Sequence, residues 1–321
     1  MRIGPWVVAV CAACGSVLSL QAGELGDKAQ PLKVKEWIKG QPVDVTTADG
    51  KHVYVVEFWA TWCGPCRASI PHLTEMQKKY KDKNVTFIGI SDEEPEVVRK
   101  FVQQMGDKMD YTVAVDDQRA TSKAYMEAFG IRGIPHAFLV DQSGRIIWQD
   151  HPMNKFEDVI DQVLAGKFDL EAARKLLAKR QEEERAMQQV FEQIQEYFRL
   201  VESKGNAEQA ALLGKKILEA GRTYPDLMNQ LAWEILTRET VVERDLKLAL
   251  TAAEAANEAT KGENAYVLDT YALALFENGR KKDAIKFQEK AVELARKSFA
   301  DNKQLLAELE GRLEKFRKES Q

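Results

Sequence analysis

The sequence predicts an α/β domain with a mixed β-sheet, followed by an all-helical domain built from repeats. Between residues 53 and 166, β-branched and aromatic runs alternate with segments whose apolar residues recur every three or four positions. After residue 205 only the helical spacing remains, and it contains an internal repeat. The length of 321 residues is also that of about two domains.

The composition is that of a globular protein, with 45% hydrophobic and 30% charged residues. Lys and Arg number 46 against 50 Asp and Glu, which gives a formal net charge of −4. Because no excess of positive charge would attract phosphate groups, we expect no nucleic-acid partner.

The first 22 residues have the features of a signal peptide. Arg2 supplies a positive start, residues 3–20 are mostly apolar or small, and Leu20-Gln21-Ala22 could precede a cleavage site. We therefore expect export, to the periplasm or as a secreted protein, with a mature chain that begins near Gly23. A retained anchor is an alternative, although the apolar stretch is short and interrupted. Lipid attachment at Cys14 is another. No second apolar run is long enough to span a membrane.

Residues 23–166 are expected to form the α/β domain. Gly64-Pro65 suits the first turn of a helix, because the backbone donor that proline lacks has no partner there anyway. Residues 141–144 have the composition of a hairpin turn. The predicted strands are 53–59, 85–90, 111–115, 136–140 and 145–149, and the predicted helices are 64–83, 94–104, 121–129 and 156–165. This order implies a mixed sheet covered by helices on both faces.

Residues 167–205 are expected to form a long helical linker and residues 206–321 a helical domain. Within the helical domain, residues 229–236 align with 269–276 and residues 249–256 align with 284–291. Small residues recur at matched positions and would let helices pack closely: Ala232, Ala249 and Ala256 in the first unit, and Ala272, Ala284 and Ala291 in the second.

The segment 276–294 resembles a tetratricopeptide repeat, although Gln288 stands at a usual aromatic position. Helices at 207–220 and 301–317 would cap the array. The resemblance implies a domain that docks a protein partner.

The cysteines point to redox chemistry. Of the four, Cys11 and Cys14 lie in the expected signal peptide, which leaves Cys63 and Cys66. A structural disulfide framework needs several separated cysteines, and a zinc site needs four ligands. The four histidines are scattered without ligand-like pairing, so we expect no metal and no other cofactor.

Cys63 would lie at the N-terminus of the predicted helix, where unpaired N–H groups and the helix dipole stabilise a thiolate. It is therefore the expected nucleophile, and Cys66, one turn later, would resolve the mixed disulfide. Glu57 precedes the pair on a strand with apolar neighbours. A buried carboxyl group there could accept the proton of Cys66. The alternative for Glu57 is a strand-end residue that faces solvent.

Two segments resemble the thioredoxin superfamily, and within it the exported TlpA/ResA-type thiol-disulfide oxidoreductases: VVEFWATWCGPCR at 55–67 and GIRGIPHAFLVDQSGRI at 130–146. The resemblance covers roughly residues 30–166 and implies a thioredoxin fold. It also implies a cis peptide bond between Ile134 and Pro135, with the backbone before the proline pairing with substrate. Trp62 could contact substrate or simply pack. Ser69 stands where the cytochrome-maturation reductases often carry an acidic residue, which weakens that narrower assignment.

Two functions are consistent with these features. The first is an exported oxidoreductase of the protein-disulfide reductase type, which takes electrons from an upstream thiol donor and docks a partner on its helical repeats. The second is a partner-binding scaffold whose thioredoxin-like domain is structural or has lost its activity. The presence of both Cys63 and Cys66 favours the first.

Overall fold

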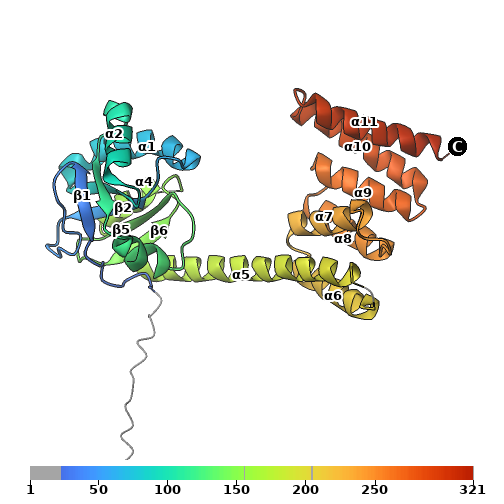
Figure 1. Cartoon of the computed structure of the whole chain (residues 1–321), viewed down its shortest axis with the longest axis horizontal. Helices are drawn as coiled ribbons and strands as arrows, with labels where there is room; N and C mark the ends of the chain where they lie inside the picture. Colours follow the sequence, from blue (N-terminus) through green and yellow to red (C-terminus); the bar gives the residue numbers. More distant parts are fainter. Residues whose placement is uncertain (1–22, 155, 204, 321) are drawn as a thin grey trace, which may run out of the picture. The chain divides into compact units, whose positions relative to one another are not determined.

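The computed structural model describes residues 23–154, 156–203 and 205–320 (Figure 1). The expected signal peptide, with Cys11 and Cys14, lies outside the described residues. The chain divides into two compact units, Met1–Leu177 and Ala178–Gln321.

The first unit contains a six-stranded sheet in the order β1-β4-β3-β2-β5-β6. The strands β2, β3 and β4 run parallel, and β1, β5 and β6 pair antiparallel with their neighbours. Their bounds are β1 Val34–Lys39, β2 Val53–Phe58, β3 Val85–Ser91, β4 Thr112–Asp116, β5 His136–Val140 and β6 Ile146–Asp150. The predicted mixed sheet is therefore confirmed. The sequence analysis missed β1, whose residues are all half-buried or exposed, so that no clear apolar run marks it.

Helices cover both faces of this sheet, as predicted. On one face, the side chains of α1, α2 and α4 pack with alternate residues of β2 such as Val53 and Val55. On the other, Tyr54 and Val56 pack with the segment around Tyr125. This division follows from the alternation of side chains along a strand. The helical bounds are α1 Gly64–Tyr80, α2 Pro95–Met105, α3 Ala120–Ser122, which continues as a π-helical turn over Lys123–Glu127, and α4 Phe156–Leu164.

The long helix α5, Leu170–Val201, begins in the first unit and ends in the second (Figure 1). It corresponds to most of the expected linker, residues 167–205, and the boundary between the units falls inside it. Its second half contributes buried side chains to the core of the helical unit, among them Val190, Ile194, Tyr197 and Phe198.

The helical unit continues through six further helices: α6 Ala207–Gly221, α7 Pro225–Thr237, α8 Leu246–Ala259, α9 Ala265–Glu277, α10 Lys281–Ser298 and α11 Lys303–Lys318. The internal repeat aligns α7 with α9 and α8 with α10. All six alanines that recur in it are fully buried, since each is 0% exposed. A side chain that ends at Cβ lets the backbones of two helices approach closely, which explains the pattern in physical terms.

Gln288, the departure from the repeat pattern, joins three helices. Its Nε2 donates to Asp269 Oδ1 of α9 at 2.6 Å and to the Leu309 carbonyl of α11 at 3.1 Å. Arg312 Nε also donates to Asp269 Oδ1, at 2.8 Å. Desolvation raises the pKa of Asp269, and Arg312 opposes that shift. The polar residue is thus the centre of a buried network.

Within the described residues, no helix combines the length and apolar character that crossing a membrane requires.

Replacing Phe316 by Ala should destabilise the helical unit by about 3–5 kcal/mol, the usual cost of removing a fully buried ring. Phe316 is 0% exposed and stacks on Phe276 with ring centroids 4.3 Å apart. Urea denaturation followed by circular dichroism would measure the change. The control is Phe299→Ala at a partly exposed position, which should cost much less. Equal losses would contradict this account of the core.

Candidate active site

The Cys63–Cys66 pair lies where β2 turns into α1. Cys63 is the N-cap of α1, with extended backbone angles (φ −78°, ψ 106°). Its carbonyl accepts the first helical hydrogen bond from Arg67 N at 3.0 Å. Its Sγ accepts a hydrogen bond from Cys66 N at 3.2 Å. The sulfur therefore takes the place of the side-chain oxygen that usually caps a helix.

Cys63 and Cys66 are joined by a disulfide, with their Cα atoms 5.2 Å apart. Cys63 keeps 5% of its surface exposed and Cys66 none. An incoming thiolate can therefore reach only the sulfur of Cys63, and Cys66 becomes the leaving group inside the protein. The structure thus brings the two predicted redox residues together and makes them unequal.

Ile134 and Pro135 lie beside the pair. The peptide bond between them is cis, as the resemblance implies. The Ile134 carbonyl oxygen is 3.8 Å from Cys63 Sγ. Trp62, directly before Cys63, is 72% exposed. An exposed indole and a backbone segment therefore flank the accessible sulfur.

Glu57 is buried and not solvent-facing, since only 1% of it is exposed. It lies two residues after Val55 and four after Val53, so its side chain points to the same face of the sheet, which α1 covers. Burial raises the pKa of Glu57 to about 8. At neutral pH its carboxyl group is therefore largely protonated in this environment.

One contact at the motif was missed by the sequence analysis. Glu93, after β3, accepts hydrogen bonds from the backbone N–H and the hydroxyl of Thr61, both at 2.7 Å. Ser91 also donates to Glu93, at 3.1 Å. The carboxyl ends of β2 and β3 meet at one edge of the sheet because the strands are parallel. The parallel pairing of the two strands could have predicted this contact. Through Thr61, Glu93 fixes the segment that leads to Trp62 and Cys63.

Ser69 is the uncharged residue that stands where the cytochrome-maturation reductases often carry an acidic one. It is fully buried, and its hydroxyl donates to the Cys66 carbonyl at 2.9 Å. Within the described part of the chain, no group of three or more His, Cys, Asp or Glu side chains could hold a metal ion.

The free energy of unfolding of the wild-type protein should fall as the pH rises, and Glu57→Gln should abolish this fall. The folded protein holds the Glu57 proton more tightly than the unfolded chain, because the folded pKa is about 8 and the ordinary value is 4.5. Stability should therefore fall between these values, at up to about 1.4 kcal/mol per pH unit. Urea denaturation of the oxidised protein across this range would measure it, because no thiol titrates there.

The matched control is Glu75→Gln, at an exposed position of α1, which should keep the slope. A slope that persists in Glu57→Gln would mean that another group titrates.

Comparison with known proteins agrees with this geometry. The redoxin family model matches residues 24–164. A thiol-disulfide oxidoreductase ResA from Bacillus thuringiensis (strain Al Hakam) is 31% identical over 127 residues, which cover 39% of this chain and 69% of the relative. The protein of that name from Bacillus thuringiensis subsp. konkukian is 33% identical over 125 residues, covering 39% and 68%.

Among solved structures, a thioredoxin family protein titled thiol:disulfide interchange protein, from Chlorobium tepidum TLS, is 28% identical. That likeness covers 44% of this chain and 99% of the other, with a TM-score of 0.36. On the identity and coverage of the ResA relatives, and with the thioredoxin-like sheet and the linked cysteine pair on one domain, this chain belongs to the thiol-disulfide oxidoreductase family.

Proposed function

We propose that the protein is an exported thiol-disulfide oxidoreductase that exchanges disulfides with protein substrates through Cys63 and Cys66. The observation that carries the proposal is the unequal exposure of two linked cysteine residues at a helix N-terminus. The family of the chain and the names of the ResA relatives support it.

The proposed exchange takes place in two steps. In the reduced protein the Cys63 thiolate, stabilised by the N-terminus of α1, attacks a substrate disulfide, forms a mixed disulfide and releases one substrate thiolate. Cys66 then loses its proton to Glu57 in the ionised form of that carboxyl group and attacks Cys63 Sγ, which releases the second substrate thiolate. The substrate gains two electrons and the Cys63–Cys66 disulfide forms. An upstream thiol donor restores the dithiol.

Substrate binding is proposed at the surface beside Cys63. Trp62 offers an exposed ring, and the backbone of Ile134, held before Pro135, would pair with an extended segment of the substrate. Both lie next to the sulfur that the substrate must reach. Protein chains with an accessible disulfide are therefore the expected substrates.

Cys63→Ser should abolish reduction of a protein disulfide with dithiothreitol as the electron source, because Cys66 has no exposed surface. Cys66→Ala should instead accumulate mixed disulfides, because the first attack is retained and the resolving step is lost. Non-reducing electrophoresis and mass spectrometry would detect them. The control is the double variant, which should trap nothing. Turnover that is unchanged in Cys63→Ser would remove Cys63 from its role as the nucleophile, whereas a wild-type protein without turnover would favour a partner-binding scaffold with a structural thioredoxin-like domain.

The helical unit is proposed to dock the protein partner, as the tetratricopeptide-like pattern implies. A groove of about 560 Å³ lies between α7, α9 and α11. Its lining mixes aromatic and polar side chains, among them Asn229, Trp233, Tyr266 and Lys315. Tyr266 is half-exposed, so it offers a ring to an incoming chain.

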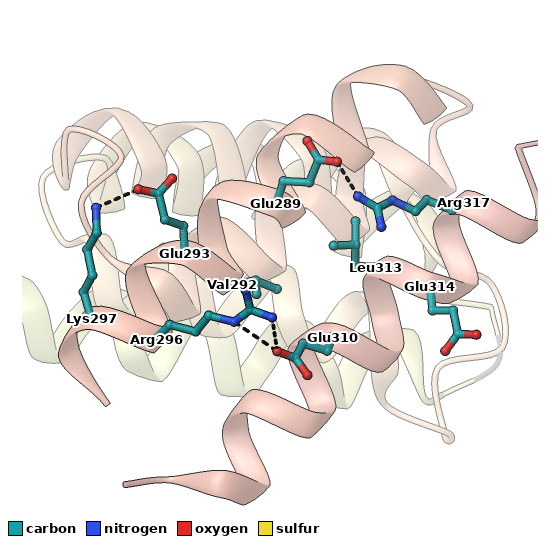
Figure 2. A pocket seen from close by; sticks show the side chains of 9 residues that line it. All are labelled: Glu289, Val292, Glu293, Arg296, Lys297, Glu310, Leu313, Glu314 and Arg317. Atoms are coloured by element: carbon teal, nitrogen blue, oxygen red, sulfur yellow. Dashed lines mark hydrogen bonds and ion pairs between the residues drawn. The ribbon is translucent and has the colours of Figure 1, made fainter. Parts of the chain in front are cut away.

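A second depression, between α10 and α11, is a weaker candidate (Figure 2). Its charges pair with one another across and along the two helices, at Arg296–Glu310, Arg317–Glu289 and Lys297–Glu293. Figure 2 shows these pairs around Val292 and Leu313, which are largely buried. The groove also offers the aromatic side chains of Trp233 and Tyr266, which this depression lacks.

Docking in the groove can be separated from the exchange reaction. In the Cys66→Ala background, Tyr266→Ala with Lys315→Ala should lower the yield of trapped protein partners several-fold. In the wild-type background, the same pair should leave reduction of a small disulfide unchanged. Quantitative mass spectrometry would measure the first and a spectrophotometric assay the second. The control is Val242→Ala, at an exposed position outside the groove. Undiminished trapping would contradict docking there.

A further inference from the structure

Two side chains that neither the motif nor the family comparison singles out lie beside Glu57. In the register of the sheet, Glu57 has Gly89 of β3 on one side and Ala137 of β5 on the other. Gly89 has no side chain, and aromatic rings lie close above it. A Cβ atom built there would be 2.9 Å from Trp59 Nε1 and 3.1 Å from Tyr111 Cε2. Both rings therefore reach over the residue next to Glu57.

The polar atoms of these three side chains are buried together without partners. Glu57, Trp59 and Tyr111 are 1%, 2% and 5% exposed. Among the described residues, no hydrogen-bond partner exists for either Glu57 carboxyl oxygen, for Trp59 Nε1 or for the Tyr111 hydroxyl. Buried polar groups are almost always hydrogen-bonded. Three buried polar side chains without partners, two of them against Gly89 and the third on the residue paired with it, therefore call for a common explanation.

The three groups are complementary. An ionised carboxylate only accepts hydrogen bonds, an indole N–H only donates, and a phenol does both. A buried water makes about three hydrogen bonds, which is what a carboxylate, an indole and a phenol over one glycine can supply. The position of Gly89 beneath the two rings explains why such polar atoms reach this depth, since any larger residue would displace them.

The surroundings of Glu57 provide no stronger partner. From α1, the titratable groups in the core on this face are Cys63, Cys66 and Tyr80, and from β3 and β5 the neighbours Gly89 and Ala137 carry none. The guanidinium of Arg67 lies 5.9 Å from the Phe101 ring of α2, and Phe101 in turn packs on Trp59. On α4, Asp161 accepts from Tyr80, and Glu157 pairs with Lys79. Tyr111 remains as the titratable neighbour before β4, and the charge of Glu57 raises the pKa of its phenol further, after desolvation.

We propose that Tyr111 and Trp59 are positioning residues that hydrogen-bond through a buried water to the Glu57 carboxylate and set the pH at which Glu57 takes the proton of Cys66. The proposal rests on the proposed function, in which Cys66 must become a thiolate to release the substrate. The step moves one proton from the Cys66 sulfur to a Glu57 oxygen, with no change of oxidation state. Before this transfer, the Tyr111 hydroxyl and the Trp59 indole stabilise the ionised Glu57 carboxylate through the water.

Tyr111→Phe tests the link without touching the cysteines. In the oxidised protein, NMR of ¹³C-labelled glutamate carboxyl groups follows Glu57 directly. Loss of a donor to the carboxylate should raise the midpoint of the Glu57 titration by about one pH unit. The control is Tyr80→Phe on the same face of the sheet, whose hydroxyl serves Asp161 and which should leave the midpoint in place. A purely structural Tyr111 would lower thermal stability and leave this midpoint unmoved, and that result would overturn the proposal.

A second measurement keeps the proposal testable if Tyr111→Phe folds poorly. In the wild-type protein, the ¹H–¹⁵N resonance of the Trp59 indole should titrate with the same midpoint as Glu57, and Glu57→Gln should abolish that titration. An indole resonance that is insensitive to pH would overturn the proposal.

Failure of the proposed function has a different signature. The pH dependence of the rate at which Cys66 releases a disulfide-linked substrate from Cys63 would then be the same with and without Glu57→Gln. The NMR titrations decide the link between Tyr111, Trp59 and Glu57 whatever that result.

Discussion

The start of α1 is the constraint on which the site depends. A helix begins with N–H groups that have no helical partner, and here a sulfur atom accepts one of them. The same local field that makes Cys63 a cap also favours its ionised form. Capping and reactivity are therefore two consequences of one arrangement. It requires that β2 end in a buried segment and that Glu93 hold Thr61 in the turn between them.

Glu57 shows what the fold tolerates for the sake of chemistry. A carboxyl group with 1% exposure is unfavourable in a sheet core, and an apolar residue of the same size would be more stable at neutral pH. A pKa of about 8 would suit the role proposed for Glu57, because a carboxylate with that value can accept the proton of a thiol. The cost to stability and the usefulness to the exchange have the same origin, which is desolvation.

Much of this arrangement could be predicted from the sequence, because local rules determine it. Alternation and helical spacing located five of the six strands and the main helices, and the matched alanines located the helix contacts of the second unit. The spacing of Cys63 and Cys66 predicted the pair that the structure joins by a disulfide. What was missed depends on contacts between distant segments. The strand β1 is recognisable only through its pairing with β4, and the hydrogen bonds of Glu93 and Gln288 appear only once strands or helices are side by side. Tyr111 looks like an ordinary strand-start aromatic until the structure places its ring against Gly89.

The sealed position of Cys66 has a consequence for timing. In the proposed exchange, a partner held covalently by Cys63 would be released by Cys66, which the partner cannot reach, so the lifetime of the mixed disulfide would be set inside the protein. Reagents and thiols in the medium can compete for Cys63 but not for its mate. The buried residues around Cys66 would therefore set the residence time of a bound chain. Substitutions among them could lengthen or shorten it without altering the surface that recognises the chain.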